Sequence, residues 1–133
     1  MIVERTLGAV DSKREALMQP RLKLKLILND NATLLGPGKV ALLEAIDREH
    51  SLSKAAKSIG MSYRRAWNLV HELNEAMADP VIETQTGGHD GGGSIVTESG
   101  RELIRLYHQL EDVANDATQT MRDALARSLK TSV

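Results

Sequence analysis

The sequence predicts a mostly helical α+β domain that holds a helix-turn-helix, a hairpin and a long carboxy-terminal helix. The chain has 133 residues, which fits one globular domain with at most a short appendage. Of these residues 41% are hydrophobic but only 2% are aromatic, and Phe is absent. Most apolar side chains are Leu, Ala, Val and Ile, which favours helices with aliphatic stripes over a large β-sandwich. Apolar residues at helical spacing and one Gly-rich segment between two β-prone runs then locate the elements.

Charge and composition exclude several classes of protein. There are 17 Lys and Arg residues against 18 Asp and Glu residues, so the formal net charge of -1 excludes a uniformly basic nucleic-acid coat protein. The absence of Cys excludes disulfides, thiolate metal sites and cysteine nucleophiles. No apolar run is long enough to span a bilayer, and the first residues lack the apolar core of a signal peptide. We therefore expect a cytoplasmic protein with no membrane partner.

The first third of the chain predicts an amino-terminal segment, a strand and a short helix. Residues 1–20 form a weak amphipathic pattern, a possible helix that Pro20 ends. Basic and apolar residues alternate from Arg21 to Leu26 and the apolar run continues to Leu28, which is typical of a strand with one buried and one basic face. Residues 29–31 then predict a turn. After Gly36-Pro37-Gly38, the apolar spacing predicts a short helix with one apolar stripe.

Two short helices joined by a tight turn are predicted next. Behind Ser51, which can cap a helix, apolar residues at Leu52, Ala55, Ala56 and Ile59 share one face, and Gly60 ends this helix. Ser62 can cap the second helix, which Asp79-Pro80 closes. So short a Gly-containing connection indicates a helix-turn-helix. The apolar face of the second helix consists of Ala66, Leu69, Val70, Leu73 and Met77.

The last part of the chain predicts a hairpin and a long helix. Val81–Thr84 and Ser94–Thr97 are β-prone runs around the Gly-rich segment 87–93. A helical stripe then runs from about residue 98 to about residue 127, which is too long for the small module before it. We expect this helix to pack on a second copy of the chain; the alternative is a helix that folds back on its own domain. The expected dimer contacts are Leu103, Leu106, Tyr107, Leu110, Val113, Ala117 and Met121.

The charges are segregated in a way that indicates a site on the helix pair. Residues 51–74 carry four basic residues and one acidic residue, whereas residues 98–123 carry six acidic and three basic residues. The side of the second helix opposite its apolar face carries Arg64, Asn68 and His71, with Arg65 and Trp67 on the flanks. Arg and Asn side chains form bidentate hydrogen bonds with base edges in a DNA major groove, although many basic helix faces are merely solvated. Trp67 is expected as a wedge between the helix and the hairpin, with a DNA contact as the alternative.

Other residues of the helix pair suit the DNA backbone. Ser62 and Tyr63 lie at the amino end of the second helix, where free amides and hydroxyls suit a phosphate oxygen. Lys54 and Lys57 on the first helix are placed to contact the backbone where that helix crosses it. Ordinary surface lysines are an equal alternative for these two residues.

Two motifs resemble those of a known family. Ser62-Tyr63-x-x-Ala66-Trp67 follows Ser51-Leu52-Ser53-Lys54-Ala55-Ala56, and Thr86-Gly87-Gly88-His89-Asp90-Gly91-Gly92-Gly93 follows in turn. Over about residues 22 to 115 the chain resembles the amino-terminal domain of ModE, the molybdate-responsive transcription regulators, whose fold is similar to that of the LysR-type DNA-binding domain. The resemblance implies a winged helix-turn-helix over residues 21–97 and a dimerisation helix over residues 98–127. It also implies that Gly88 and His89 of the wing contact the flanking DNA backbone.

The resemblance gives a functional expectation. We expect a homodimeric transcription regulator that binds double-stranded DNA at a palindromic operator; the alternative is a winged-helix module that binds a protein and does not read DNA. ModE continues into molybdate-binding modules, whereas this chain ends at Val133, so molybdate is not expected to bind here.

Features typical of enzymes and metal sites are weak in this sequence. Gly36-Pro37-Gly38-Lys39 resembles a fragment of a phosphate loop, but its Gly spacing is wrong and Val40 stands where Ser or Thr should hold magnesium. The four His residues are too scattered for a metal site, and no Ser, His and acid pattern resembles a catalytic motif. We expect no cofactor, no metal and no catalytic activity.

Overall fold

A computed structural model describes residues 18–85 and 93–130 of the chain. The described residues are mostly helical, with two two-stranded antiparallel sheets, so the predicted α+β class is confirmed. The chain divides into two compact units. The central unit is Lys23–Leu110, and the terminal unit combines Met1–Leu22 with Glu111–Val133.

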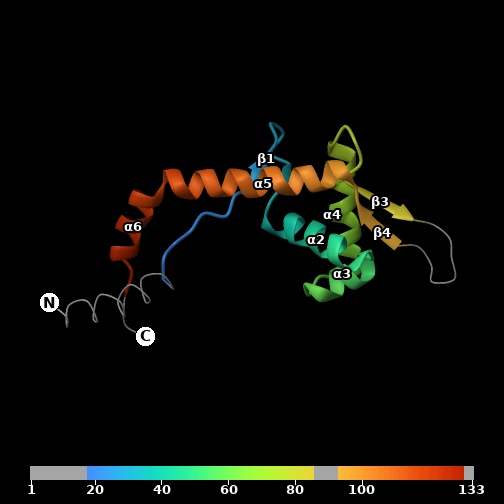
Figure 1. Ribbon diagram of the computed structural model, residues 1–133, viewed down its shortest axis with the longest axis horizontal. Helices are drawn as coiled ribbons and strands as arrows, with labels where there is room; N and C mark the ends of the chain where they lie inside the picture. Colours follow the sequence, from blue (N-terminus) through green and yellow to red (C-terminus); the bar gives the residue numbers. More distant parts are fainter. Residues whose placement is uncertain (1–17, 86–92, 131–133) are drawn as a thin grey trace. The chain divides into compact units, whose positions relative to one another are not determined.

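Three helices precede the hairpin in the central unit: α2 (Pro37–Glu49), α3 (Leu52–Ser58) and α4 (Tyr63–Ala76), as Figure 1 shows. Helix α2 begins inside the predicted Gly-Pro-Gly boundary rather than after it, because Pro37 occupies the first helical turn, where its missing N–H costs nothing. It ends at His50, whose φ of 55° is left-handed and whose N–H donates to the Ile46 carbonyl at 2.8 Å. Buried side chains of all three helices form one core; among them are Val40, Leu42, Leu43, Ile46, Leu52, Ala55, Ala56, Ala66 and Leu73.

A short antiparallel pair, β1 (Leu26–Ile27) and β2 (Thr33–Leu35), precedes these helices. The strand predicted over residues 21–28 is therefore much too long. Only three residues of β2 are available before Gly36 and Pro37 start α2, and the register is irregular between Leu26 and Ile27, so the ladder cannot extend. The turn predicted at residues 29–31 is confirmed, because the Asn31 N–H donates to the Leu28 carbonyl at 2.9 Å.

The predicted hairpin strands are confirmed within one residue at each end. They are β3 (Ile82–Gln85) and β4 (Gly93–Val96), which pair antiparallel from Ile82 with Val96 to Gln85 with Gly93. The Ser94 N–H donates to the His50 carbonyl at 3.1 Å, which fixes the hairpin to the end of α2. The tip of the hairpin, including Gly88 and His89, lies outside the described residues.

Two helices follow where the sequence predicts one over residues 98–127: α5 (Glu98–Ala117) and α6 (Gln119–Arg127). The prediction of a continuous helix is wrong because Thr118 interrupts it. The Thr118 hydroxyl donates to the Ala114 carbonyl at 2.7 Å, and its N–H shifts to the Asn115 carbonyl at 3.3 Å. Such back-bonding by a hydroxyl competes with the regular helical ladder.

The terminal unit is held by polar contacts around α6 and the end of α5. Asn115 binds both backbone groups of Leu22, accepting from its N–H at 2.8 Å and donating to its carbonyl at 3.2 Å. Arg122 is buried and donates to the Pro20 carbonyl at 2.9 Å and to the Thr118 hydroxyl at 3.1 Å. Most of the possible helix over residues 1–20 lies outside the described residues, and residues 18–20 are not helical. Within the described ranges, every helix is too short or too polar to cross a membrane.

Candidate nucleic-acid interface

Helices α3 and α4 are fixed by the caps that the sequence predicts. The Ser51 hydroxyl accepts from the Lys54 N–H, and the Ser62 hydroxyl accepts from the Arg65 N–H, each at 3.2 Å. Between the helices Gly60 has a φ of +69°, a left-handed conformation that favours Gly. The Met61 N–H donates to the Ala56 carbonyl at 2.9 Å and closes this turn. The pair is thus tight and defined by local hydrogen bonds.

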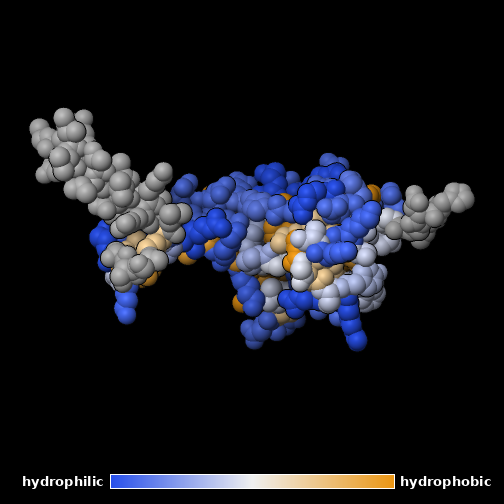
Figure 2. Space-filling view, turned by 90° about the horizontal axis from the view of Figure 1, so that it is seen from below, coloured by the Kyte–Doolittle hydropathy of each residue, from blue (hydrophilic) through white to orange (hydrophobic). Residues whose placement is uncertain are grey.

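On α3 and α4, the basic and amide side chains predicted to contact DNA are exposed. On α4 the apolar side is buried at Ala66 and Leu73, and Arg64 and Asn68 lie on the opposite, exposed side. Viewed from below, the surface of the molecule is largely hydrophilic, with a few apolar residues between charged and polar ones (Figure 2). The side chains of the predicted interface that are exposed are Lys54, Lys57, Ser62, Tyr63, Arg64, Arg65 and Asn68.

Trp67 does not act as the predicted wedge. Its side chain is 49% exposed, and its ring stacks on His71 with a centroid distance of 5.0 Å and an interplanar angle of 9°. The prediction failed because a large aromatic residue on the flank of a helix was assumed to be buried. The stack with His71, one turn away, covers only part of the surface of the Trp67 ring.

The residue that joins α4 to the hairpin is Asn74, which the sequence reasoning missed. Its side-chain oxygen accepts from the Val81 N–H at 2.8 Å, and its amide donates to the Ile82 carbonyl at 3.0 Å. The pairing fixes the helix against the start of β3. The only signal in the sequence was an Asn beside the apolar stripe of a helix, where it favours helix formation poorly.

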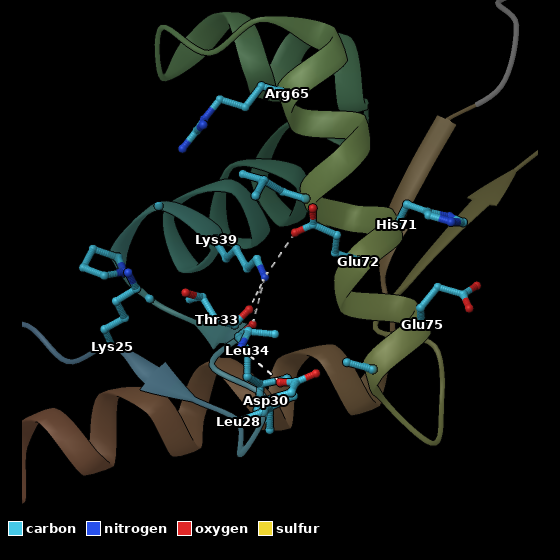
Figure 3. A pocket seen from close by; sticks show the side chains of 16 residues that line it. Lys25, Leu28, Asp30, Thr33, Leu34, Lys39, Arg65, His71, Glu72 and Glu75 are labelled. Carbon is cyan, nitrogen blue, oxygen red and sulfur yellow. Dashed lines mark hydrogen bonds and ion pairs between the residues drawn. The ribbon is translucent and has the colours of Figure 1, made fainter.

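A groove of about 910 Å³ lies on the other flank of α4, next to β1 and β2 (Figure 3). Lys39, which belongs to the segment that resembles a fragment of a phosphate loop, lines this groove. Its contacts are structural. Its buried ammonium donates to the Thr33 carbonyl at 2.7 Å and pairs with Glu72 at 3.6 Å. Figure 3 shows Arg65 on the Lys39 side of α4 and His71 on the opposite side. The groove is lined by both acids and bases, so no charged ligand is favoured.

The predicted dimer residues of α5 divide into two groups. Leu106, Leu110 and Val113 are 43%, 46% and 61% exposed and recur along one side of the helix, and Leu103 is half-buried. Tyr107 is only 1% exposed, because it belongs to the core of its own unit and donates to the Leu24 carbonyl at 2.8 Å. Placing Tyr107 at a surface for a partner is therefore wrong. Ala117 and, on α6, Met121 are exposed.

The geometry of the described residues gives little support for a metal site or for proton transfer. In the two described ranges no three His, Asp or Glu side chains gather in a way that would hold a metal ion. On α5 the Arg105 guanidinium donates to the Glu102 carboxylate at 2.8 Å and holds the pKa of Glu102 below its usual value. This exposed pair is a surface feature of the helix.

Comparison with known proteins identifies relatives of the chain. It is 34% identical over 96 residues to the molybdenum transport protein ModE of Azotobacter vinelandii, which covers 72% of this chain and 36% of the relative. It is 40% identical to the molybdenum-pterin-binding protein MopB of Rhodobacter capsulatus (64% of this chain, 32% of the relative). It is 33% identical to the DNA-binding transcriptional dual regulator ModE of Escherichia coli K12 (82% of this chain, 39% of the relative). The chain is related to the ModE family.

The relationship to ModE agrees with the family resemblance stated from the sequence, whereas the match to the amino-terminal winged helix-turn-helix domain stays a prediction. No family model matches the chain. The chain spans only 32–40% of the length of these ModE and Mop proteins.

Proposed function

We propose that the chain is a DNA-binding transcription regulator of the ModE type, with a winged helix-turn-helix in which α4 is the recognition helix. The observation that carries the proposal is the exposed Arg64 and Asn68 on the outer side of a helix whose inner side is buried. Such a helix inserts its outer side into the major groove, where Arg reads guanine and Asn reads adenine. The name of the Escherichia coli relative, a DNA-binding transcriptional regulator, supports the same function.

The distribution of charge along α4 favours one end of the helix as the part that enters the groove. Arg64, Arg65 and Asn68 lie in its first half, whereas Glu72 and Glu75 lie in its second half. DNA repels the acidic half, so the amino-terminal half faces the bases, as in other helix-turn-helix proteins. The Ser62 cap and the Asn74 clamp hold the two ends of this helix.

The remaining contacts position the protein on the DNA backbone. In the proposal, Ser62 and Tyr63 contact phosphates at the amino end of α4, and Lys54 and Lys57 contact them from α3. The hairpin of β3 and β4 is the wing, and Gly88 and His89 at its tip contact the flanking backbone. These contacts give affinity and register, whereas Arg64 and Asn68 give sequence preference.

The proposed regulator acts as a homodimer that pairs through the exposed side of α5. Leu106, Leu110 and Val113 form an apolar stripe on this helix, which a second copy can bury. Two recognition helices would then reach half-sites about 34 Å apart on a palindromic operator. The names of the relatives, which mention molybdenum for two of them and transcriptional regulation for others, further support a role in molybdenum-related gene regulation.

The test begins with selection of duplexes from a random pool by the purified chain. Fluorescence anisotropy then compares a selected duplex with a shuffled one at 50 mM and 200 mM salt, a change that lowers affinity about 10³-fold or more when a protein contacts several phosphates. We expect tight, steeply salt-dependent binding to the selected duplex. Equal binding to both duplexes, or none, would favour a module that binds a protein.

Arg64→Ala is the matched test of the recognition side. Loss of a bidentate base contact should weaken binding to the selected duplex by about 1–3 kcal/mol and relax its specificity. Arg48→Ala on α2 is the control, because Arg48 is also exposed but lies off the proposed interface. If Arg64→Ala weakens the selected and shuffled duplexes equally, Arg64 is a phosphate contact.

A further inference from the structure

A large aromatic surface is exposed on the helix that we propose enters DNA. Tyr63 is 56% exposed and Trp67 is 49% exposed, and the two lie one turn apart on α4. Two neighbouring exposed aromatic rings on a helix face offer apolar surface whose burial against a partner is favourable. Trp67 therefore needs an explanation that the wedge prediction did not supply.

The exposed indole is held in one orientation. The ring of His71 lies nearly parallel to it, at 5.0 Å and 9°, and covers part of its surface. His71 is one turn further along the same helix, on the opposite side from Lys39 (Figure 3). A side chain that is ordered before binding loses less entropy when it makes a contact. The stack thus prepares the free part of the indole for a partner.

Trp67 lies between the base-reading side of α4 and the wing. It is three residues from Arg64 and so neighbours it on the helix surface. Asn74, seven residues further along on the same side, binds β3. When Arg64 faces base edges, Trp67 faces the adjacent wall of the groove. The partner that meets the indole there must offer apolar surface, since most of the exposed ring is apolar.

We propose that Trp67, positioned by His71, contacts the C5-methyl group of a thymine and so determines part of the sequence preference. This inference rests on the proposed function. Thymine is the base that presents a methyl group in the major groove, whereas the other base edges offer hydrogen-bond donors and acceptors. The chemistry of the partner thus follows from the apolar surface that α4 leaves exposed.

The experiment removes the methyl group alone. In the selected duplex, each thymine is replaced in turn by deoxyuridine, and anisotropy measures the affinity. We expect one position in each half-site at which the replacement lowers affinity about fourfold, the effect of one buried methyl group. In Trp67→Ala the replacement at that position should have no further effect, because the contact is already lost. Trp67→Phe keeps an aromatic surface and should keep part of the methyl dependence.

Two further measurements separate a contact from a structural effect. The chain has one Trp, so its intrinsic fluorescence reports on Trp67 directly and should change when the thymine duplex binds. Lys57→Ala on α3 is the control: a lost phosphate contact lowers affinity equally on thymine and deoxyuridine duplexes. His71→Ala should reduce the methyl dependence without abolishing binding. Circular dichroism verifies that each variant folds.

The possible outcomes distinguish this inference from the proposed function. If the wild-type chain binds no duplex with sequence preference, both fail. If binding is specific but deoxyuridine has no effect at any position, the thymine contact is wrong and the proposed function stands. If Trp67→Ala loses affinity equally on both duplexes, Trp67 contacts the backbone through its N–H and the inference is again overturned.

Discussion

Lys39 shows how one buried charge can join three elements. It lies in α2, is only 8% exposed, donates to the Thr33 and Leu34 carbonyls of β2 at 2.7 and 3.3 Å, and pairs with Glu72 of α4. Each partner compensates for the cost of removing the ammonium group from water. The residue therefore fixes the position of α4 relative to the rest of the central unit.

Lys39→Met should lower the free energy of unfolding. Met fills a similar volume but leaves the two β2 carbonyls without their donor, which costs about 1–3 kcal/mol. Urea denaturation followed by circular dichroism measures the change. Lys54→Met is the matched control, since Lys54 is exposed and should change stability little. An unchanged stability of Lys39→Met would mean that water replaces the ammonium group at the carbonyls.

Gly100 is required by a close approach in the first turn of α5. A Cβ atom there would lie 2.3 Å from the Val81 carbonyl oxygen and 2.7 Å from Cγ1 of Val96. Gly100→Ala should therefore destabilise the chain by about 1–3 kcal/mol, as overpacking does in other cores. Gly38→Ala on α2 is the control, because a Cβ there meets nothing within 4 Å. Equal unfolding free energies for the two variants would show that α5 can shift away from β3.

Single residues differ in how far the sequence reveals their role. Ser51, Gly60 and Ser62 were predicted because caps and left-handed turns depend on a few neighbouring residues. Asn74 and Tyr107 were missed or misplaced because their partners, Val81 and Leu24, come from other elements. The same limit explains the error at Trp67, whose exposure depends on the packing around α4.

Helix α5 carries an ion pair whose effect depends on pH. The side-chain hydrogen bond from Arg105 lowers the pKa of Glu102 in the folded chain below the value of about 4.3 expected when unfolded. The pair thus contributes stability above that unfolded value, and this contribution is lost as the pH falls through the lower folded pKa. Solvent screens the pair, so the effect is small.

Arg105→Gln should raise the pKa of Glu102 toward its unfolded value. NMR titration of the Glu102 carboxyl carbon measures it directly. Arg101→Gln is the control, because Arg101 pairs with Asp47 instead and should leave the pKa of Glu102 in place. If Arg105→Gln also left the pKa of Glu102 unchanged, a group other than Arg105 would be responsible for the lowered pKa.

The predicted helices and strands agree with the structure where local sequence patterns determine them. The three helices α2, α3 and α4 have apolar residues at helical spacing and clear boundary residues, so their existence was predicted well. The strand over residues 21–28 was overestimated because alternation alone does not show how long its partner is. The interruption at Thr118 was missed because the apolar stripe continues through it, whereas the break depends on the hydrogen bonds of the Thr118 hydroxyl and N–H.

For the whole molecule, net charge is a poor guide to function and its distribution is a good one. The formal net charge of -1 hides an exposed group of basic residues on α3 and α4 and an acidic excess along α5. Since a polyanion interacts with local charge within about a Debye length, the basic face alone determines the proposed DNA binding. Composition and periodicity therefore predicted the fold class, whereas the site needed the arrangement of exposed side chains.

The exposed apolar stripe of α5 predicts that the chain associates with a second copy of itself. Leu110→Glu places a carboxylate in the middle of Leu106, Leu110 and Val113 and should weaken dimerisation roughly tenfold or more, since an unpaired charge would be buried. Sedimentation equilibrium measures the dimer dissociation constant of each variant. Gln109→Glu is the control, with the same new charge on an adjacent exposed residue. Binding to a palindromic duplex should fall with dimerisation while binding to a single half-site stays constant. A wild-type chain that is monomeric at all concentrations would assign the stripe to another partner.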